Sequence, residues 1–404
     1  MKRPQSGSAR SSDRRSASSS QRGRSTGPAS SRRSAAARRT GVWNAGRVQE
    51  RDDTPYLLVD DDRLRRNIER LAGWAATQGL QLRPHAKTHK CTQVAQRQID
   101  AGAAGLTVAT IAEAEAFADA GFTDLFIAYP LWLSPTKADR LRALASRCAL
   151  RVGVDSVDGA RRLAAGLRGA PVEVLIEIDS GMHRTGVAPD EAGEIAAAAR
   201  DGGLQTIGVF TFPGHGYGPG PARSEAARQE AESLSEAAES LRRSRIDPRV
   251  ISGGSTPTVA FADAAGLTEI RPGVYPFNDA QQWELGSCDA GQIALVAMAT
   301  VVSVDARRRR AVLDAGSKTL GADRPPWTTG FGRLLDYPDA RIVSLSEHHA
   351  VVEHPSGTTL PGLGELVRAI PNHVCTAVNL TDELVADTAH GTEHWPIIGR
   401  GANR

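Results

Sequence analysis

Short runs of apolar and β-branched residues alternate with Ala-, Leu- and Arg-rich segments from residue 56 onward. The runs are typical of strands, and the segments between them repeat their apolar positions at helical spacing. Strand–helix–strand units of this length form parallel sheets, and eight or so in succession favour a closed (β/α)8 TIM-like barrel over an open sheet. The predicted strands are 56–60, 80–84, 105–110, 124–130, 150–156, 172–180, 205–212, 248–254 and 268–273.

The pattern changes after about residue 285, where strand-like segments follow one another with turns between them and little helix. We therefore expect a barrel over 47–284 and a mainly antiparallel β domain over 285–404. Residues 41–55 are a candidate for one more strand of the β domain.

The first 46 residues form a leader rich in Ser, Arg, Gly and Ala. Residues 1–40 carry eleven Lys or Arg and one Asp, so the net charge of +3 divides into +10 there and −7 over 41–404. No apolar segment follows the arginine pairs, which excludes a twin-arginine export signal. We interpret the leader as a disordered extension rather than a nucleic-acid-binding arm, because residues 1–40 contain no aromatic residue for stacking. The net charge of −7 over residues 41–404 argues against nucleic acid as a partner of this part of the chain.

The apolar runs and the cysteines indicate the cellular compartment of the protein. No run of 18 or more apolar residues exists, which argues against a membrane span. Cys91, Cys148, Cys288 and Cys375 are scattered and form no CxxC pair, as expected in a reducing cytoplasm. We interpret the first three as packing residues.

Polar and glycine-rich segments follow five of the predicted strands. Catalytic residues of barrel enzymes lie at the C-terminal ends of the strands, so these five segments are expected on one rim. They are Lys87, Tyr129, 179–187, 212–218 and 252–256.

Two of these segments suggest a cofactor. In "SGGST" (252–256), Gly253 and Gly254 allow successive N–H groups to form an anion nest, although a plain βα turn is an equally good interpretation. In "LRPHAKTHK" (82–90), Lys87 is either part of a solvated basic turn or an amine whose pKa is lowered by His85, His89 and Lys90. A phosphate site near a lysine indicates pyridoxal phosphate, with Tyr275 as a second phosphate contact.

His373 and Cys375 stand two residues apart in a predicted strand, where both side chains would face the same side and hold one divalent ion. From the residues alone, two buried structural side chains are the better interpretation.

Six motifs in this order, "RPHAKTHK", "GMHRTG", "SGGSTPT", "RPGVYPFND", "VLDAGSKTL" and "PNHVCTAVNL", resemble the D-serine dehydratase and D-threonine aldolase family of alanine-racemase-like (fold-type III) pyridoxal-phosphate enzymes. The resemblance covers nearly everything from Thr54 onward. It implies that Lys87, rather than Lys90, binds the cofactor. It further implies phosphate contacts from Gly253, Gly254, Ser255 and Tyr275, a contact from Arg184 to the phenolic oxygen, His215 and Tyr217 beside the ring, and a metal on His373 and Cys375.

The resemblance implies a lyase that acts on D-β-hydroxy-amino acids. A D-serine or D-threonine dehydratase, giving a 2-oxo acid and ammonia, is favoured because the cysteine at 375 suits zinc. A D-threonine aldolase, giving glycine and an aldehyde, is the alternative, with manganese as the alternative metal. An amino-acid racemase is a more distant possibility, and a non-catalytic pyridoxal-phosphate carrier is disfavoured by the β domain. A homodimer is expected.

Overall fold

The computed structural model describes residues 53–404. The leader predicted at 1–46 lies outside the described residues, and so does the choice between a disordered extension and a nucleic-acid-binding arm. Within 53–404 the chain forms two sheets, one of eight strands and one of nine.

The eight-stranded sheet is entirely parallel, and its strands follow the order β2-β9-β8-β7-β6-β5-β4-β3. It closes into a barrel where His85 pairs with Thr107, whose N–H donates to the carbonyl of Pro84 at 2.8 Å. This confirms the predicted barrel. Its strands are β2 (Gln81–Leu82), β3 (Leu106–Val108), β4 (Asp124–Pro130), β5 (Ala149–Val154), β6 (Val172–Glu177), β7 (Gln205–Phe210), β8 (Val250–Gly253) and β9 (Glu269–Ile270).

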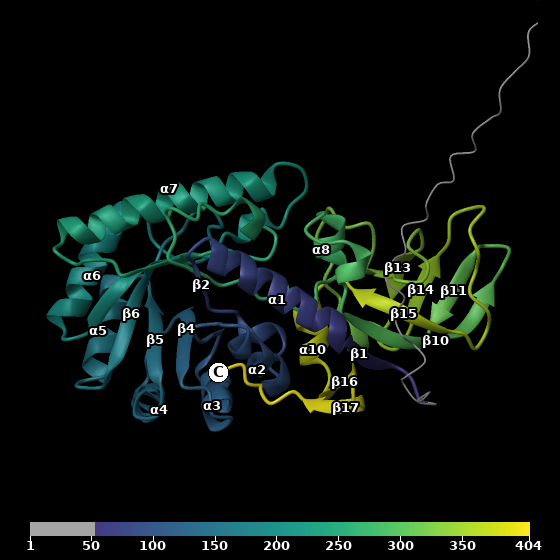
Figure 1. The fold of residues 1–404 in the computed structure, drawn as a ribbon, viewed down its shortest axis with the longest axis horizontal. Helices are drawn as coiled ribbons and strands as arrows, with labels where there is room; N and C mark the ends of the chain where they lie inside the picture. The colour runs from purple at the N-terminus through teal and green to yellow at the C-terminus, as the bar shows by residue number, and fades with distance from the viewer. Residues whose placement is uncertain (1–52) are drawn as a thin grey trace, which may run out of the picture. The chain divides into compact units, whose positions relative to one another are not determined.

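Helices cover the outside of the barrel strands, as Figure 1 shows for α5, α6 and α7. Several begin at a side-chain cap, such as Ser134, which accepts from the N–H of Lys137, and Ser156, which accepts from that of Gly159. Within 53–404, no helix is both long and apolar enough to cross a bilayer. The helices are α1 (Asp61–Thr77), α2 (Thr92–Asp100), α3 (Ile111–Asp119), α4 (Pro135–Ala145), α5 (Val157–Gly166), α6 (Ala192–Asp201), α7 (Ala222–Arg243) and α8 (Ala280–Glu284).

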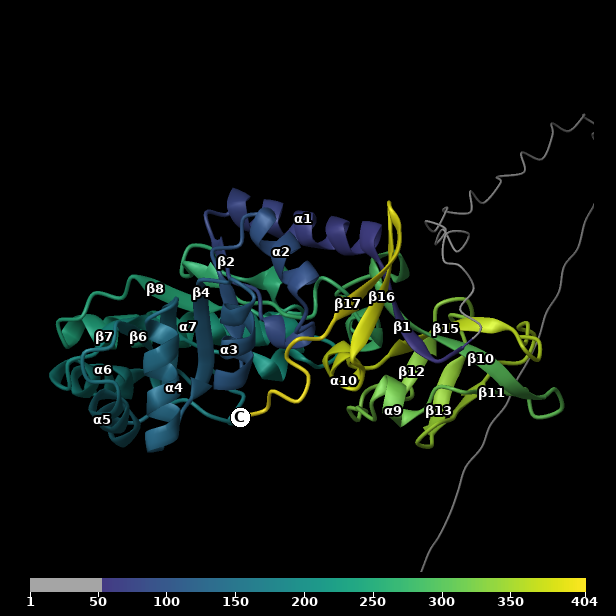
Figure 2. The ribbon, with the colours of Figure 1, turned by 90° about the horizontal axis from the view of Figure 1, so that it is seen from below.

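The nine-stranded sheet is mainly antiparallel, as predicted, with the order β11-β14-β13-β12-β15-β10-β1-β16-β17. Two short helices, α9 (Ser317–Leu320) and α10 (Val374–Asn379), connect its strands. Figure 2 shows β1 beside β16. The strands are β1 (Tyr56–Asp60), β10 (Leu295–Asp305), β11 (Arg310–Leu313), β12 (Gly332–Leu334), β13 (Arg341–Leu345), β14 (Ala350–Glu353), β15 (Leu366–Pro371), β16 (Glu383–Thr388) and β17 (Gly391–Pro396).

One strand lies in a different sheet from the one predicted. Residues 56–60 were expected to open the barrel, but β1 pairs antiparallel with β10 and parallel with β16. The error has a physical reason. Leu57, Leu58 and Val59 are all buried, so this run lacks the alternation that would distinguish a strand of an antiparallel sheet from a barrel strand. The strand predicted at 268–273 supplies β9, which completes the barrel.

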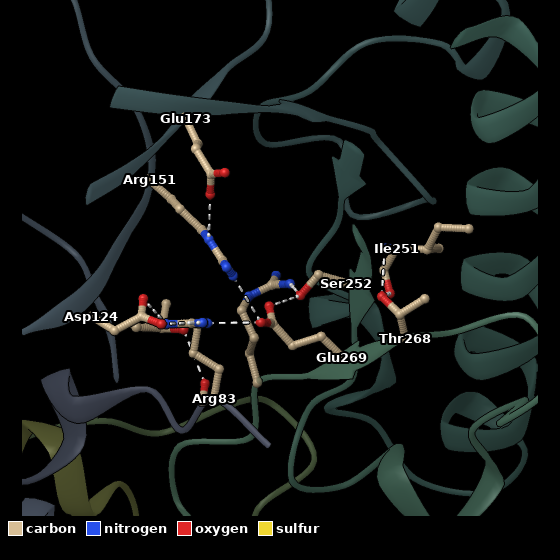
Figure 3. Close-up of polar contacts among 10 residues, drawn as sticks. Arg83, Asp124, Arg151, Glu173, Ile251, Ser252, Thr268 and Glu269 are labelled. Carbon is tan, nitrogen blue, oxygen red and sulfur yellow. Dashed lines mark hydrogen bonds and ion pairs between the residues drawn. The ribbon is translucent and has the colours of Figure 1, made fainter. Parts of the chain in front are cut away.

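A network of charged side chains lies among the barrel strands (Figure 3). Glu269 is 1% exposed and forms ion pairs with Arg83 at 2.7 Å and with Arg151 at 3.3 Å. Arg83 also pairs with Asp124 at 2.7 Å. Removing one partner would leave an uncompensated buried charge, so this network constrains how the strands pack. Glu269 also accepts a hydrogen bond from Ser252 of β8, the strand that leads into the predicted phosphate loop.

Candidate active site

A cavity of about 350 Å³ is lined by barrel loops and by residues of the C-terminal domain. This size suits a cofactor-sized ligand. Five residues predicted from the sequence line it, namely Lys87, Tyr217, Ser255, His373 and Cys375. The structure therefore brings the candidate lysine and the candidate metal ligands, separated by nearly 300 residues of chain, to one cavity.

Lys87 lies in a single 3₁₀ turn, Ala86–Thr88, directly after the barrel closes. His85 caps this turn, because its ring accepts a bond from the N–H of Lys87 at 3.5 Å. The Nζ atom of Lys87 lies 5.7 Å from the centroid of the Phe212 ring, and the guanidinium carbon of Arg184 lies 5.4 Å from the same ring. Arg184 is exposed, yet it shares this aromatic neighbour with the lysine.

The prediction that His85, His89 and Lys90 provide positive charge beside Lys87 is wrong. His89 is buried, and burial lowers its pKa to about 4, so the imidazole is neutral. Burial likewise holds the pKa of His85 well below its ordinary value. The ammonium of Lys90 lies 3.2 Å from Glu113 and 2.9 Å from the Asn379 side chain, so its charge is compensated there. Sequence proximity did not reveal which way each side chain turns.

Arg271 is a cationic residue of the cavity that the sequence analysis did not single out. It is 6% exposed, and it donates hydrogen bonds to the Ser252 hydroxyl and the Thr211 carbonyl. It directly follows β9, within the quoted motif "RPGVYPFND". A charge at the C-terminal end of a barrel strand was the signal that could have identified it.

The backbone amides of the glycine loop do not form the anion nest that the sequence predicts. The N–H of Gly254 donates to Glu230 at 2.7 Å, and the N–H of Ser255 donates to Thr258 at 3.0 Å, so both amides are satisfied within the protein. A Cβ on Gly253 would come within 2.4 Å of the Glu230 carboxylate, which explains the glycine. The hydroxyl-bearing Ser255 and its neighbour Thr256 line the cavity instead.

Tyr275 is buried and does not line the cavity. Its hydroxyl accepts a bond from Gln98 at 3.0 Å, and Gln98 also contacts the His89 ring at 3.2 Å. The tyrosine is therefore tied to the segment that carries Lys87. Burial raises the pKa of Tyr275, so its hydroxyl stays protonated and keeps its own proton to donate.

The two aromatic residues predicted beside the cofactor ring fall in different places. Tyr217 lines the cavity, and burial together with nearby Asp279 and Cys375 raises its pKa well above the ordinary value. His215 does not line it and contacts the Gln229 side chain at 2.9 Å. Tyr129, expected on the same rim, is 51% exposed and also lies outside the cavity lining.

His373 and Cys375 lie at the start of α10, not in a strand as predicted. β15 ends at Pro371, and His373 is the N-cap of the helix. Nδ1 of His373 is buried without a hydrogen-bond partner, 3.4 Å from Asp279 Oδ2. The Cys375 thiol donates to Thr88 Oγ1 at 3.3 Å.

The two side chains also interact with each other. Burial opposes ionisation of the Cys375 thiol, but the His373 imidazolium lowers its pKa overall. Imidazole and thiolate are the donors that zinc prefers, and a carboxylate beside one ring nitrogen, as Asp279 lies beside Nδ1 of His373, is the usual partner of a histidine that binds metal through its other nitrogen. The described residues hold no group of three or more His, Cys, Asp or Glu side chains arranged for a metal. A metal on this pair would therefore keep coordination positions for other ligands.

The remaining cysteines behave as predicted. Cys91, Cys148 and Cys288 are buried and free, whereas Cys375 is partly exposed.

The cavity further includes Asp323 and Gln281, which the sequence analysis missed. Neither follows a barrel strand or belongs to a recognisable ligand pattern, so no sequence signal pointed to them.

Comparison with known proteins agrees with this geometry. Residues 59–280 match the family described as "Alanine racemase, N-terminal domain", and residues 294–386 match the "Putative serine dehydratase domain". The chain is 37% identical over 349 residues to D-threo-3-hydroxyaspartate dehydratase of Delftia sp. (strain HT23), covering 80% of this chain and 91% of the relative. It is 34% identical over 366 residues to D-threonine aldolase of Arthrobacter sp., covering 88% and 94%.

Solved structures give the same result. The Delftia enzyme superposes with a TM-score of 0.79 at 35% identity, over 85% of this chain and 97% of that one. Alanine racemase from Corynebacterium glutamicum, at 21% identity and a TM-score of 0.56, shares the fold over 78% of this chain and 89% of its own. A parallel barrel whose lysine faces a C-terminal β domain defines a class of pyridoxal-phosphate enzymes. This chain belongs to the alanine-racemase-like, fold-type III family of that class.

Proposed function

We propose that this chain is a metal-dependent lyase that acts on D-β-hydroxy-amino acids and that its main reaction is dehydration. With D-serine the products are pyruvate and ammonia. The observation that carries the proposal is that Lys87, His373 and Cys375 line one cavity. The names of the relatives, a D-threo-3-hydroxyaspartate dehydratase and a D-threonine aldolase, support this substrate class.

Pyridoxal phosphate, when bound, supplies an electron sink for the negative charge that develops at Cα. Lys87 is the residue proposed to hold its aldehyde carbon. Arg271 and the hydroxyls of Ser255 and Thr256 line the same cavity and suit the phosphate. Tyr275, Gly253 and Gly254 support that loop from outside the lining. We assign Arg184 to the phenolic oxygen and His215 and Tyr217 to the surroundings of the ring.

The α-proton has a proposed acceptor. The Nζ of Lys87 takes the α-proton, because it is an amine that faces the cavity beside Phe212. The neutral imidazole of His85 holds the backbone of that turn and does not compete for the proton. The rings of Phe212 and Tyr217 exclude water from the reacting carbon.

His373 and Cys375 would hold a zinc ion, which acts as a Lewis acid toward the β-hydroxyl group. The thiolate favours zinc over manganese, since softer ligands suit the softer ion. Among the solved structures of D-threo-3-hydroxyaspartate dehydratase are a cysteine-to-alanine variant in a metal-free form and a histidine-to-alanine variant. The two altered positions are two residues apart, the same spacing as His373 and Cys375, which supports the proposed pair.

A D-threonine aldolase is the second candidate, because a relative of that name is 34% identical over most of both chains. Product analysis separates the two activities. A 2-oxo acid and ammonia from D-serine or D-threonine support the dehydratase, whereas glycine and acetaldehyde from D-threonine support the aldolase. A racemase would form the L-enantiomer and would keep its activity after chelation.

The central test is reduction of the protein with borohydride after incubation with pyridoxal phosphate, followed by peptide mass mapping. The pyridoxyl group is expected on Lys87. A label on Lys90, or no label, contradicts the proposal. The same preparation, assayed after chelation and again after zinc is restored, is expected to lose and regain D-serine turnover.

A further inference from the structure

The geometry points to Asp323 as a residue that selects substrates by charge. It disfavours a carboxylate at Cβ and thereby favours D-β-hydroxy-amino acids with small neutral side chains. This inference rests on the proposed function and narrows its substrate class. It concerns a side chain of the C-terminal domain that lines the cavity and has no part in the chemistry proposed above.

Asp323 lies beside the segment that carries the candidate metal ligands. Its backbone carbonyl accepts a hydrogen bond from the Asn372 side chain at 2.8 Å, and Asn372 directly precedes His373. A Cβ on Gly321 would lie 2.8 Å from the Thr376 side chain and 3.2 Å from Asp323 Oδ2. Both distances are measured from the same point, so the Asp323 carboxylate lies close to Thr376 of α10.

The carboxylate of Asp323 keeps its negative charge free to act on a ligand. Within 53–404, none of the hydrogen bonds or ion pairs involves its carboxylate oxygens. Its neighbour Arg324 packs over the Phe331 ring, with its guanidinium carbon 4.8 Å from the centroid. Of the basic side chains that line the cavity, Lys87 and Arg271 come from the barrel and already have roles in holding the cofactor, His85 is neutral, and His373 is assigned to the metal.

The consequence follows from where the substrate's Cβ must lie. If the β-hydroxyl binds beside His373 and Cys375, the remaining substituent on Cβ is next to Asp323. A hydrogen or methyl group there is tolerated, whereas a second carboxylate meets a like charge in a partly desolvated cavity. A like charge opposite a ligand group rejects that ligand by repulsion, without any need for a better contact to the preferred one. The chain should thus differ from its relatives that act on 3-hydroxyaspartate.

The test compares D-threonine with D-threo-3-hydroxyaspartate, with all forms of the protein loaded with cofactor and zinc. We expect kcat/KM to favour D-threonine in the unaltered protein. Asp323→Asn is expected to shift the ratio of the two values by about tenfold toward 3-hydroxyaspartate. Asp339→Asn removes the same charge from an exposed position of the same domain outside this cavity lining, and it should leave the ratio unchanged.

A binding measurement accompanies the kinetics. D-Aspartate lacks the β-hydroxyl and cannot lose water, so its dissociation constant, compared with that of D-alanine, reports on the second carboxylate without the elimination step. Asp323→Asn should tighten D-aspartate binding by about tenfold and leave that of D-alanine unchanged. An unchanged ratio, or an equal fall in kcat for both substrates, overturns this inference and leaves the lyase intact. No turnover of any D-β-hydroxy-amino acid would instead overturn the proposed function.

Discussion

The thiol of Cys375 lies 3.3 Å from Oγ1 of Thr88, the residue next to Lys87. One residue belongs to the turn that closes the barrel and the other to the first turn of α10 in the C-terminal domain. A second link is parallel to it, because Lys90 reaches Asn379 at the end of the same helix. The candidate metal ligands are therefore held against the lysine turn by direct contacts at both ends of α10.

Metal content should depend on Cys375 and on no other cysteine. We expect Cys375→Ala to reduce bound zinc from about one ion per chain to less than about 0.1, because a single imidazole is too weak a site. The measurement is elemental analysis after dialysis against buffered zinc. Cys148→Ala, which alters a buried thiol outside the cavity lining, is the matched control and should retain the metal. Zinc retained by Cys375→Ala would show that another set of ligands binds it.

Lys90 should matter for stability and not for the cofactor. Lys90→Met leaves the buried Glu113 carboxylate without its cation, which should lower the free energy of unfolding by about 3 kcal/mol. The pyridoxyl label should remain on Lys87. Lys318→Met breaks an exposed ion pair with Glu347 and should leave the stability nearly unchanged, because water screens pairs at the surface. Denaturant titration measures the change in stability, and peptide mapping locates the pyridoxyl label. Loss of the label from Lys87 in the Lys90→Met variant would refute the prediction that Lys90 does not matter for the cofactor.

Gly253 should be intolerant of a side chain. A Cβ there would lie 2.4 Å from Glu230, so Gly253→Ala must displace the loop that carries Ser255 and Thr256. We expect a loss of about 2 kcal/mol in stability and at least tenfold weaker binding of pyridoxal phosphate. The control is Gly73→Ala in α1, where no atom lies within 4 Å of the new Cβ. That change should leave cofactor affinity as it is and stabilise the helix by about 0.5–1 kcal/mol.

Glu230 should make stability depend on pH. Burial raises its pKa to about 7, although the Gly254 N–H and Arg271 oppose this. Because the folded pKa lies above the unfolded one, the folded state binds the proton more tightly. Its contribution is complete below about pH 4.5 and is lost as the pH rises through 7. We expect about 2–3 kcal/mol of this loss between pH 5 and pH 8.

The comparison for this pH dependence is Glu230→Gln, which cannot ionise. Its unfolding free energy should lack that part of the decline, so its stability relative to the unaltered protein should increase with pH. Glu232→Gln alters a nearby exposed residue of the same helix and should keep the original slope. Equal slopes for all three proteins, measured by urea titration, would mean that Glu230 does not titrate in this range.

The two-domain architecture was predictable from the chain because it depends on local patterns. The period of the apolar positions indicates which segments are strands and which are helices. Their alternation over 80–273 predicts β/α units whose strands are parallel. The same logic failed for β1, whose fully apolar run fits either sheet. Only the pairing of Tyr56 with Met298 on one side and of Leu58 with Val385 on the other decides its place.

The candidate site divides in the same way. The residue types and the order of the motifs were enough to predict a cofactor lysine, a phosphate-binding glycine loop and a His–Cys metal pair. The chemistry of these groups depends on residue type and spacing, and both can be seen in the sequence. The tertiary structure alone decided that Lys90 turns to Glu113, that the Gly254 amide is taken by Glu230, and that Asp323 joins the cavity. Each of these facts depends on contacts between segments far apart in the chain, and no local pattern encodes a distance.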